Sequence, residues 1–425
     1  MSITRLALRQ QLGEQETGLA TLGIATATGT TTTVIDATRL KGAWSASRWS
    51  RGTAIRFSTL NAAAVTTGTT LDSYAPSTGT ITVLPAITAP VANDVFEIWS
   101  AVDSVDEVDD AIDRGLTRRC FRWVPVPLTK VTDGDCGDTA VTSLWTASGA
   151  TVVPTKVNVA FPDKIGRRWL RTLHSSNAAA YVYSATMNAV GGDIWQLSAI
   201  CKVAAGTSAL VAYDVTNSAA ISLSGDGGTY TGRAPAHLDS TFTVPATCKQ
   251  IRIHVGGAGT TAADDVYWTN IIAYQQDETQ FVLPMRIANE RKIGNVLYRS
   301  GDDYEDFAFR PYCESGRHAG ISAEMGGVVV RLSTAPGTGD PAYVEELCTY
   351  DSLSGDTSTT DCNEELALAC IKYEFMKGLA NKGYALPTPQ GYLAPSEWRL
   401  RREEAKAEML SKQASLGAQS KTVFR

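Results

Sequence analysis

The chain has 425 residues, of which 44 % are hydrophobic and only 19 % are charged. This length predicts roughly two to four domains, and the apolar fraction is sufficient to give each of them a core. The 38 basic and 44 acidic residues give a net charge of −6. Such a balance disfavours wrapping of nucleic acid, which requires clustered lysine and arginine, so we expect no sequence-specific nucleic-acid partner.

The N-terminal sequence and the hydropathy pattern predict no membrane partner. Within Met1–Leu22, Arg5, Arg9 and Glu14 interrupt any apolar stretch that could serve as a secretory signal. No segment approaches the ~20 apolar residues that span a bilayer. We therefore expect a protein that assembles in a cytoplasm.

Cysteine and histidine spacing argues against metal and cofactor sites. The eight cysteines form no CxxC pair, and the four histidines are scattered along the chain, so zinc-ligand spacing is absent. We expect no cofactor and no metal, and we expect the cysteines to be buried reduced thiols. Disulfides that form late, within or between the subunits of an assembly, stay open as an alternative.

Residues 1–124 are expected to form an N-terminal β-module with an arm and a helix. Alternating apolar and polar residues predict strands at Thr53–Phe57, Thr80–Leu84 and Val95–Trp99. The first residues, up to about residue 20, carry spaced leucines that predict a short helix or an arm.

The spacing of apolar residues becomes helical over Val105–Leu116. Ser104 and Glu107 form a capping-box pattern at the start of this helix. Pro125 and Pro127 follow it and predict a linker.

Residues 130–276 are expected to form a β-sandwich, because short strand-like runs alternate there with turn residues. The predicted strands are Trp169–Thr172, Ala180–Ser184, Ile194–Lys202, Ala209–Val215, Ile251–Val255 and Asp265–Tyr274.

Residues 281–425 are expected to form a mixed segment that ends in helices and a tail. A capping-box pattern at Asp361–Glu364 precedes a helical stripe over Leu366–Ala380. A second helix is predicted from near Ser396, and Gln413–Arg425 is predicted to be a flexible tail that orders on binding. The predicted fold class is therefore α+β, mainly β, with a central β-sandwich between an N-terminal β-module and C-terminal helices.

The sequence contains no recognisable catalytic constellation. It lacks a GxSxG elbow, an HExxH helix, a P-loop and a full dinucleotide-binding fingerprint. His254 lies in an alternating run, where a surface or core-edge histidine is the simpler interpretation. The acidic pairs Asp264–Asp265 and Asp302–Asp303 are candidates for glycoside hydrolysis, which depends on the spatial separation of two carboxylates. Solvated or calcium-compatible loop carboxylates are the simpler interpretation of both pairs. We expect no catalytic residues, and hence no enzyme.

Aromatic residues gather in the central segment, and sugars stack on exposed aromatic faces. Trp169, Tyr181, Tyr183 and Trp195 are the candidates for a glycan-facing surface. Core and cross-strand packing is the alternative role for these side chains.

The central segment resembles the jelly-roll, carbohydrate-binding-module-like domains that occur as inserts in many secreted and virion proteins. Ile194–Ile200, with Lys202 after it, is similar to an early strand of that family, and Asp265–Tyr274 is similar to its closing strand. The resemblance covers about a third of the chain. It implies a jelly-roll fold and a glycan as a candidate ligand.

The flanking segments resemble the head–tail connector proteins, also called neck or adaptor proteins, of tailed phages. The resemblance is carried by Thr33–Asp36, Leu40, Leu71–Gly79, Ile81–Pro85 and Phe96–Trp99, followed by the predicted helices Val105–Leu116 and Glu364–Ala380. It implies a non-enzymatic structural protein in the neck region of the virion. The implied partners are copies of the same chain in a homo-oligomeric ring, the portal protein, and other neck or tail proteins.

The last predicted helix supplies the expected contact with the portal. Trp398, Arg399, Arg401 and Arg402 lie on it, and Trp and Arg are enriched among interface anchors. A solvated helix is the alternative. Two other functions stay open: a tail-fibre or spike component that binds host glycans through the jelly roll, and a glycan-cleaving enzyme.

Overall fold

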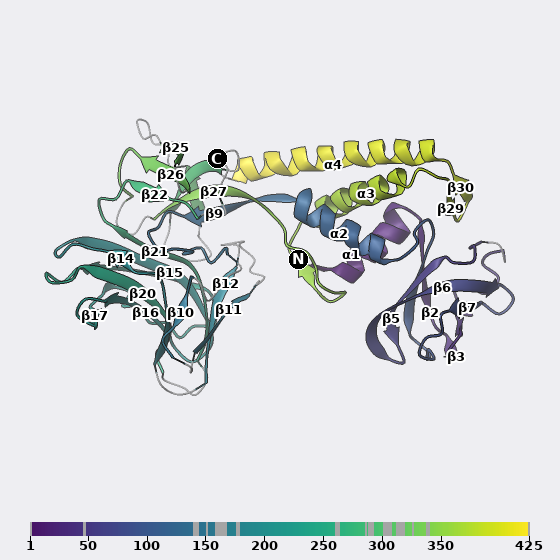
Figure 1. Cartoon of the computed structure of the whole chain (residues 1–425), viewed down its shortest axis with the longest axis horizontal. Helices are drawn as coiled ribbons and strands as arrows, with labels where there is room; N and C mark the ends of the chain where they lie inside the picture. Colours follow the sequence, from purple (N-terminus) through teal and green to yellow (C-terminus); the bar gives the residue numbers. More distant parts are fainter. Residues whose placement is uncertain are drawn as a thin grey trace. The chain divides into compact units, whose positions relative to one another are not determined.

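A computed structural model describes most of the chain (Figure 1). The described residues are 2–45, 48–138, 144–149, 152–157, 168–175, 179–259, 264–284, 287, 293–300, 308–311, 319–324, 327–336 and 341–423. The chain divides into two compact units: the first consists of residues 1–122 and 349–420, and the second of residues 123–348 and 421–425. In the sequence, the main part of the second unit is therefore an insertion within the first. The predicted boundaries at residues 124, 130, 276 and 281 stay predictions.

A seven-stranded sheet forms the β-rich part of the first unit, with the strand order β2-β8-β5-β6-β7-β4-β3. The strands are β2 (Ala20–Ile24), β3 (Ala27–Thr30), β4 (Thr33–Ile35), β5 (Ala54–Leu60), β6 (Ala63–Ala75), β7 (Thr80–Leu84) and β8 (Val95–Trp99). Val34, Phe57 and Phe96 belong to the core of this sheet. The three strands predicted between residues 53 and 99 are confirmed.

The first unit also contains helical segments and two small strand pairs. The helical segments are α1 (Arg5–Gln11), the π-helical turn η1 (Leu12–Glu16), α2 (Asp106–Arg118), α3 (Glu364–Asn381) and the larger part of α4 (Pro395–Val423). The paired strands are β1 (Ile3–Thr4) with β28 (Thr359–Thr360), and β29 (Leu386–Thr388) with β30 (Gly391–Leu393).

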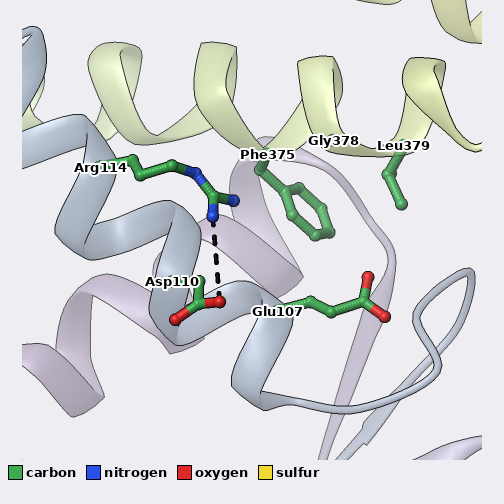
Figure 2. A pocket seen from close by; sticks show the side chains of 6 residues that line it. All are labelled: Glu107, Asp110, Arg114, Phe375, Gly378 and Leu379. Carbon is green, nitrogen blue, oxygen red and sulfur yellow. Dashed lines mark ion pairs between the residues drawn. The ribbon is translucent and has the colours of Figure 1, made fainter.

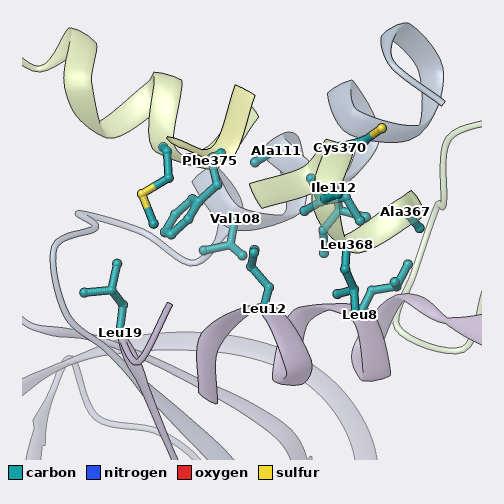
Figure 3. Close-up of a cluster of buried hydrophobic side chains, with 14 of the residues drawn as sticks. Leu8, Leu12, Leu19, Val108, Ala111, Ile112, Ala367, Leu368, Cys370 and Phe375 are labelled. Carbon is teal, nitrogen blue, oxygen red and sulfur yellow. The ribbon is translucent and has the colours of Figure 1, made fainter. Parts of the chain in front are cut away.

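A second core of the first unit lies among these helices (Figure 3). Leu8, Val108, Ile112 and Phe375 contribute side chains from α1, α2 and α3. The helices α2 and α3 approach closely at Gly115, where an added Cβ would lie 2.8 Å from the Cα of Ile371. Glycine at this position therefore permits the helix contact.

Side chains cap both helices near the predicted positions, but the capping contacts differ in detail from the predicted pattern. At α2, the Ser104 hydroxyl accepts a hydrogen bond from the Asp106 amide (3.1 Å), and the Glu107 carboxylate accepts one from the Asp103 amide (3.2 Å). At α3, the cap is Asn363, whose side chain accepts from the Leu366 amide at 3.1 Å. The Asp361 carboxylate, which the pattern placed at the cap, instead pairs with Arg122 at 2.6 Å.

The second unit is built on two six-stranded sheets that share one core. The first sheet has the order β10-β13-β20-β16-β17, with β14 also paired to β20. Its strands are β10 (Thr146–Ala147), β13 (Ala180–Tyr183), β14 (Met187–Asn188), β16 (Ser208–Asp214), β17 (Ala219–Ile221) and β20 (Gln250–Gly257).

The second sheet of the sandwich has the order β11-β12-β21-β15-β19-β18. Its strands are β11 (Val152–Val157), β12 (Trp169–His174), β15 (Ile194–Ala205), β18 (Ser224–Gly225), β19 (Ala236–Thr243) and β21 (Asp265–Gln275). Val182 and Ile253 from the first sheet and Leu197 and Val266 from the second lie in the common core. The predicted β-sandwich is confirmed, and the two strands that carry the family resemblance, β15 and β21, pair antiparallel within it.

Two smaller sheets complete the second unit. They have the orders β22-β26-β25 and β24-β23-β27-β9. Their strands are β9 (Phe121–Pro127), β22 (Gln280–Val282), β23 (Ile293–Ser300), β24 (Ala308–Pro311), β25 (Ala319–Glu324), β26 (Gly327–Leu332) and β27 (Ala342–Thr349).

Two expectations about chain segments are wrong. Pro125 and Pro127 lie in β9 and not in a linker; β9 is the last strand of its sheet, and edge strands tolerate proline because one side of the backbone needs no ladder partner. The segment after Gln413 is not a flexible tail as far as Val423, because α4 continues to that residue. Alanine, glutamine and lysine in this segment are good helix formers.

The fold class is confirmed as α+β and mainly β. None of the described helices combines the length and the apolar character needed to cross a bilayer. The seven cysteines within the described segments are buried, as expected, and Cys313 lies outside those segments.

Candidate functional site

The sandwich sheet that contains β13, β16 and β20 has one face in the core and one face directed away from it (Figure 1). Residues alternate between the faces of a strand. In β20, Ile251, Ile253 and Val255 enter the core, so the residues between them, Arg252 and His254, lie on the other face.

The same alternation places three tyrosines beside these two residues. Tyr181 and Tyr183 in β13 alternate with core residues, as does Tyr213 in β16. The strand register pairs Tyr183 with His254 and Tyr213 with Arg252. We call the surface formed by Tyr181, Tyr183, Tyr213, Arg252 and His254 the tyrosine face.

The rings of the tyrosine face surround His254. The His254 ring centroid lies 4.5 Å from that of Tyr213 in a stacked arrangement, and 5.6 Å from those of Tyr181 and Tyr183. The imidazole is only 5 % exposed, whereas the three tyrosines are half-buried. Each tyrosine therefore keeps part of its surface accessible on a face that the core does not use.

Arg252 lies on top of this aromatic cluster. Its guanidinium carbon is 3.9 Å from the ring centroid of Tyr183 and 5.0 Å from that of Tyr213, which is cation–π geometry. Its Nε donates a hydrogen bond to Nε2 of His254 at 2.8 Å. Burial, together with the charge of Arg252, lowers the pKa of His254 to about 4. The imidazole is therefore neutral at pH 7 and accepts this bond.

Two of the four predicted glycan-facing residues lie on the tyrosine face, and two are buried. Tyr181 and Tyr183 lie on the face; Trp169 is 2 % exposed and Trp195 is 3 % exposed. Trp195 stacks on Phe242 inside the sandwich at a centroid distance of 6.2 Å. The two tryptophans therefore present no surface on which a sugar could stack.

The prediction missed Tyr213, Arg252 and His254 as members of one surface. The signal was present in the alternation of Ile251–Val255 and Ala209–Val215, which assigns each of the three residues to one face of its strand. The sequence did not reveal that β13, β20 and β16 are neighbours, and that adjacency brings the residues together.

The residues predicted to contact a portal lie on α4 in different environments. Trp398 is completely buried in the helical core of the first unit, so its ring offers no area to a partner. Arg399 is exposed, Arg401 lies 5.4 Å from the Trp398 ring, and Arg402 pairs with Glu403. Of the four predicted residues, only Arg399, Arg401 and Arg402 could therefore contact a partner.

The first unit contains a small pocket beside α2 and α3 (Figure 2). Its volume is about 110 Å³, and it is lined by Glu107, Asp110, Arg114, Phe375, Gly378 and Leu379. Arg114 lies 3.9 Å from Asp110, and Lys382 lies 3.1 Å from Glu107. Ligand pockets usually enclose about 300–1,000 Å³, so this one is too small to be a substrate site.

The acidic residues singled out in the sequence have structural roles where the structure describes them. Asp264 is buried and accepts a hydrogen bond from the Gly259 amide at 2.8 Å. Asp265 pairs with Arg171 through two bonds of 2.8 Å. Asp302 and Asp303 lie outside the described residues, as does His318. Within the described segments, no group of three histidine, cysteine or acidic side chains could hold a metal ion.

Comparisons with known proteins find weak structural similarity, confined to about a third of the chain. No family model matches the chain, and no curated protein matches it. The enzymatically active domain of tailspike protein 4 of bacteriophage CBA120 is 18 % identical, with a TM-score of 0.28, over 35 % of this chain and 21 % of that one.

Two further solved structures are similar over about a third of the chain. A putative sugar binding protein from Bacteroides thetaiotaomicron is 8 % identical over 35 % of this chain and all of that one, with a TM-score of 0.27. The C-terminal family 22 carbohydrate binding module of Clostridium thermocellum Xyn10B is 16 % identical over 32 % of this chain and 91 % of that one, with a TM-score of 0.26. About a third of the chain is thus similar to carbohydrate-binding-module-like sandwiches and to a tailspike domain, at a level too low to assign a function.

Proposed function

We propose that this chain is a non-enzymatic structural protein of a phage particle, in which the second unit binds carbohydrate through the tyrosine face. The observation that carries the proposal is the grouping of three half-buried tyrosines on the side of a sheet that faces away from the core. This proposal corresponds to the tail-fibre or spike function left open by the sequence, except that Tyr213 replaces the buried Trp169 and Trp195 in the candidate glycan site.

The chemistry of the tyrosine face suits a sugar. The C–H faces of pyranose rings pack on aromatic rings, and tyrosine hydroxyls can bond to sugar hydroxyls at the edge of the contact. His254 and the register of β13, β20 and β16 hold the three rings in place before a ligand arrives. Such preorganisation reduces the entropy lost on binding.

A glycan array probed with the full chain tests the proposal. Alanine at Tyr183 or Tyr213 is expected to weaken binding to any glycan hit by about tenfold or more, since truncating an aromatic hot-spot residue costs about 2 kcal/mol or more. Tyr267→Ala is the matched control, because Tyr267 is a half-buried tyrosine on the other sheet of the sandwich. Absence of glycan binding, or equal loss in all three variants, would refute the proposal.

The connector function is a second candidate that rests on α4. Leu400 is 62 % exposed and Leu410 is 51 % exposed on this helix, and Arg399, next to Leu400 in the sequence, is also exposed. A helix with such a surface suits a contact in a ring of subunits or with a portal protein. Cryo-electron microscopy of the particle tests it: a closed ring beneath the portal supports the connector function, and density at the tail tip or on side fibres excludes it.

A further inference from the structure

The positive charge of Arg252 determines which sugars the tyrosine face can accept. The described residues of this face are Tyr181, Tyr183, Tyr213, Arg252 and His254, and Arg252 carries the single formal charge among them because His254 is neutral at pH 7. The described contacts of Arg252 are the bond from Nε to His254 and the stacking on Tyr183 and Tyr213. Its two terminal nitrogens therefore have no hydrogen-bond partner among the described residues.

The stacked position of Arg252 disfavours neutral sugars. At 3.9 Å from the Tyr183 centroid, the guanidinium occupies the surface on which a sugar ring would pack. A neutral sugar must displace it and lose the cation–π contact. An acidic sugar can keep the guanidinium in place, pack on the neighbouring ring surface, and pair its carboxylate with the terminal nitrogens.

The geometry of Arg252 suits a carboxylate in particular. A guanidinium presents parallel N–H donors that match the two oxygens of a carboxylate, and charge-assisted bonds of this kind are about twice as strong as neutral ones. The bond to His254 fixes the rotation of the guanidinium plane through Nε. The donors on the terminal nitrogens are therefore oriented before the ligand binds.

We infer that the tyrosine face selects acidic glycans, in which a pyranose ring carrying a carboxylate packs on a tyrosine while the carboxylate pairs with Arg252. The inference rests on the proposed carbohydrate binding and adds the ligand class. Uronic acids and sialic acids share this chemistry, and the probes distinguish them.

The test measures affinities of the full chain for matched acidic and neutral polymers. Polygalacturonate is compared with its methyl ester, and polysialic acid with its carboxyl-reduced form, in the same buffer at 50 and 300 mM NaCl. We expect at least one acidic polymer to bind about tenfold or more tighter than its neutral form, as expected for a hydrogen bond to a charged group. The preference is expected to shrink at the higher salt concentration.

Three variants assign the preference to Arg252. Arg252→Gln is expected to reduce it to less than about threefold, and Arg252→Lys to retain part of it, since lysine keeps the charge but not the paired donors. Arg233→Gln is the control, because Arg233 is an exposed arginine of the same unit that bonds to the Val203 carbonyl. Thermal unfolding of each variant verifies that it is folded.

The outcomes separate this inference from the proposed function. Equal affinity for the acidic and neutral forms, no binding of either acidic polymer, or an unchanged preference in Arg252→Gln would overturn the selection of acidic glycans. Binding of neutral glycans that Tyr213→Ala abolishes would still support the tyrosine face as a carbohydrate site. If Arg233→Gln removes the preference for acidic polymers as fully as Arg252→Gln does, the preference reflects net charge. This result would also overturn the inference.

Discussion

A buried arginine in the first unit gives the sharpest prediction about stability. The side chain of Arg9 is fully buried. Its Nε bonds to Glu97 at 2.9 Å, and its terminal nitrogens bond to Asp109 at 2.9 Å and to Asp356 at 2.7 and 2.9 Å. These partners come from β8, from α2 and from the segment after β27, so Arg9 joins parts of the chain that are far apart in the sequence.

The electrostatic consequences of this burial are large. Burial alone would lower the pKa of Arg9, but hydrogen bonds and charge from Asp356 and Glu97 outweigh it, and the pKa is raised. Conversely, burial would raise the pKa of Asp356, but Arg9 outweighs that effect and lowers it. Replacing Arg9 by Met would leave the Glu97 carboxylate buried and without this cation. Breaking a buried ion pair in this way costs about 3–5 kcal/mol.

Hydrogen exchange of the full chain, followed by mass spectrometry, is the appropriate assay. The two units need not unfold together, and exchange resolves them by peptide. Arg9→Met is expected to reduce protection of α1, β8 and α2 by the equivalent of about 3–5 kcal/mol, while β15 and β21 keep theirs.

The matched control for this assay is Arg51→Met. Arg51 also pairs with an aspartate, Asp72, but its side chain is 73 % exposed, so the effect should be below about 1 kcal/mol. Equal protection in Arg9→Met and wild type would refute the reasoning that the buried pair holds these segments together.

Three further predictions concern packing and pH. Gly115→Ala should destabilise the first unit by about 1–3 kcal/mol despite the better helix propensity of alanine, because the new Cβ would overlap Ile371; urea unfolding measures this, and a stabilised variant would contradict it. Trp398→Ala should cost about 3–5 kcal/mol, because the ring is fully buried; a loss below about 1 kcal/mol in the same assay would show that the ring is not a core residue. The lowered pKa of His254, about 4, means that the unfolded chain binds a proton that the folded chain does not between about pH 6.5 and 4. The stability present above pH 6.5 should therefore fall in this window by up to about 3 kcal/mol, and His254→Gln should reduce that dependence; an identical pH profile in the variant would contradict it.

Regular periodicity made the helices and many of the strands predictable. Apolar residues at helical spacing identified α2 and α3, and the alternation in β5, β7 and β8 identified those strands. The caps were displaced by a residue or two, because several neighbouring residues can bond to free helix amides. At α3 this role falls to Asn363 and not to Asp361.

The missed features depend on contacts that one sequence does not specify. Proline predicted a linker at Pro125 and Pro127, but an edge position in the sheet accommodates both residues in β9. Alternation of residues along β12 and β15 separates the two faces of each strand, but it does not show which face is covered. Trp169 and Trp195 were therefore assigned to a sugar-binding surface, although both are buried. Arg9 was noted only as an interruption of an apolar stretch, since its partners lie about 90 to 350 positions away.

The most direct test of the carbohydrate-binding site is a crystal structure of the full chain with the tightest-binding oligosaccharide from the array. The predicted result is a sugar ring packed on Tyr181, Tyr183 or Tyr213, with a carboxylate of the ligand at Arg252. A sugar bound elsewhere on the chain, with the tyrosine face unchanged, would contradict the proposed site.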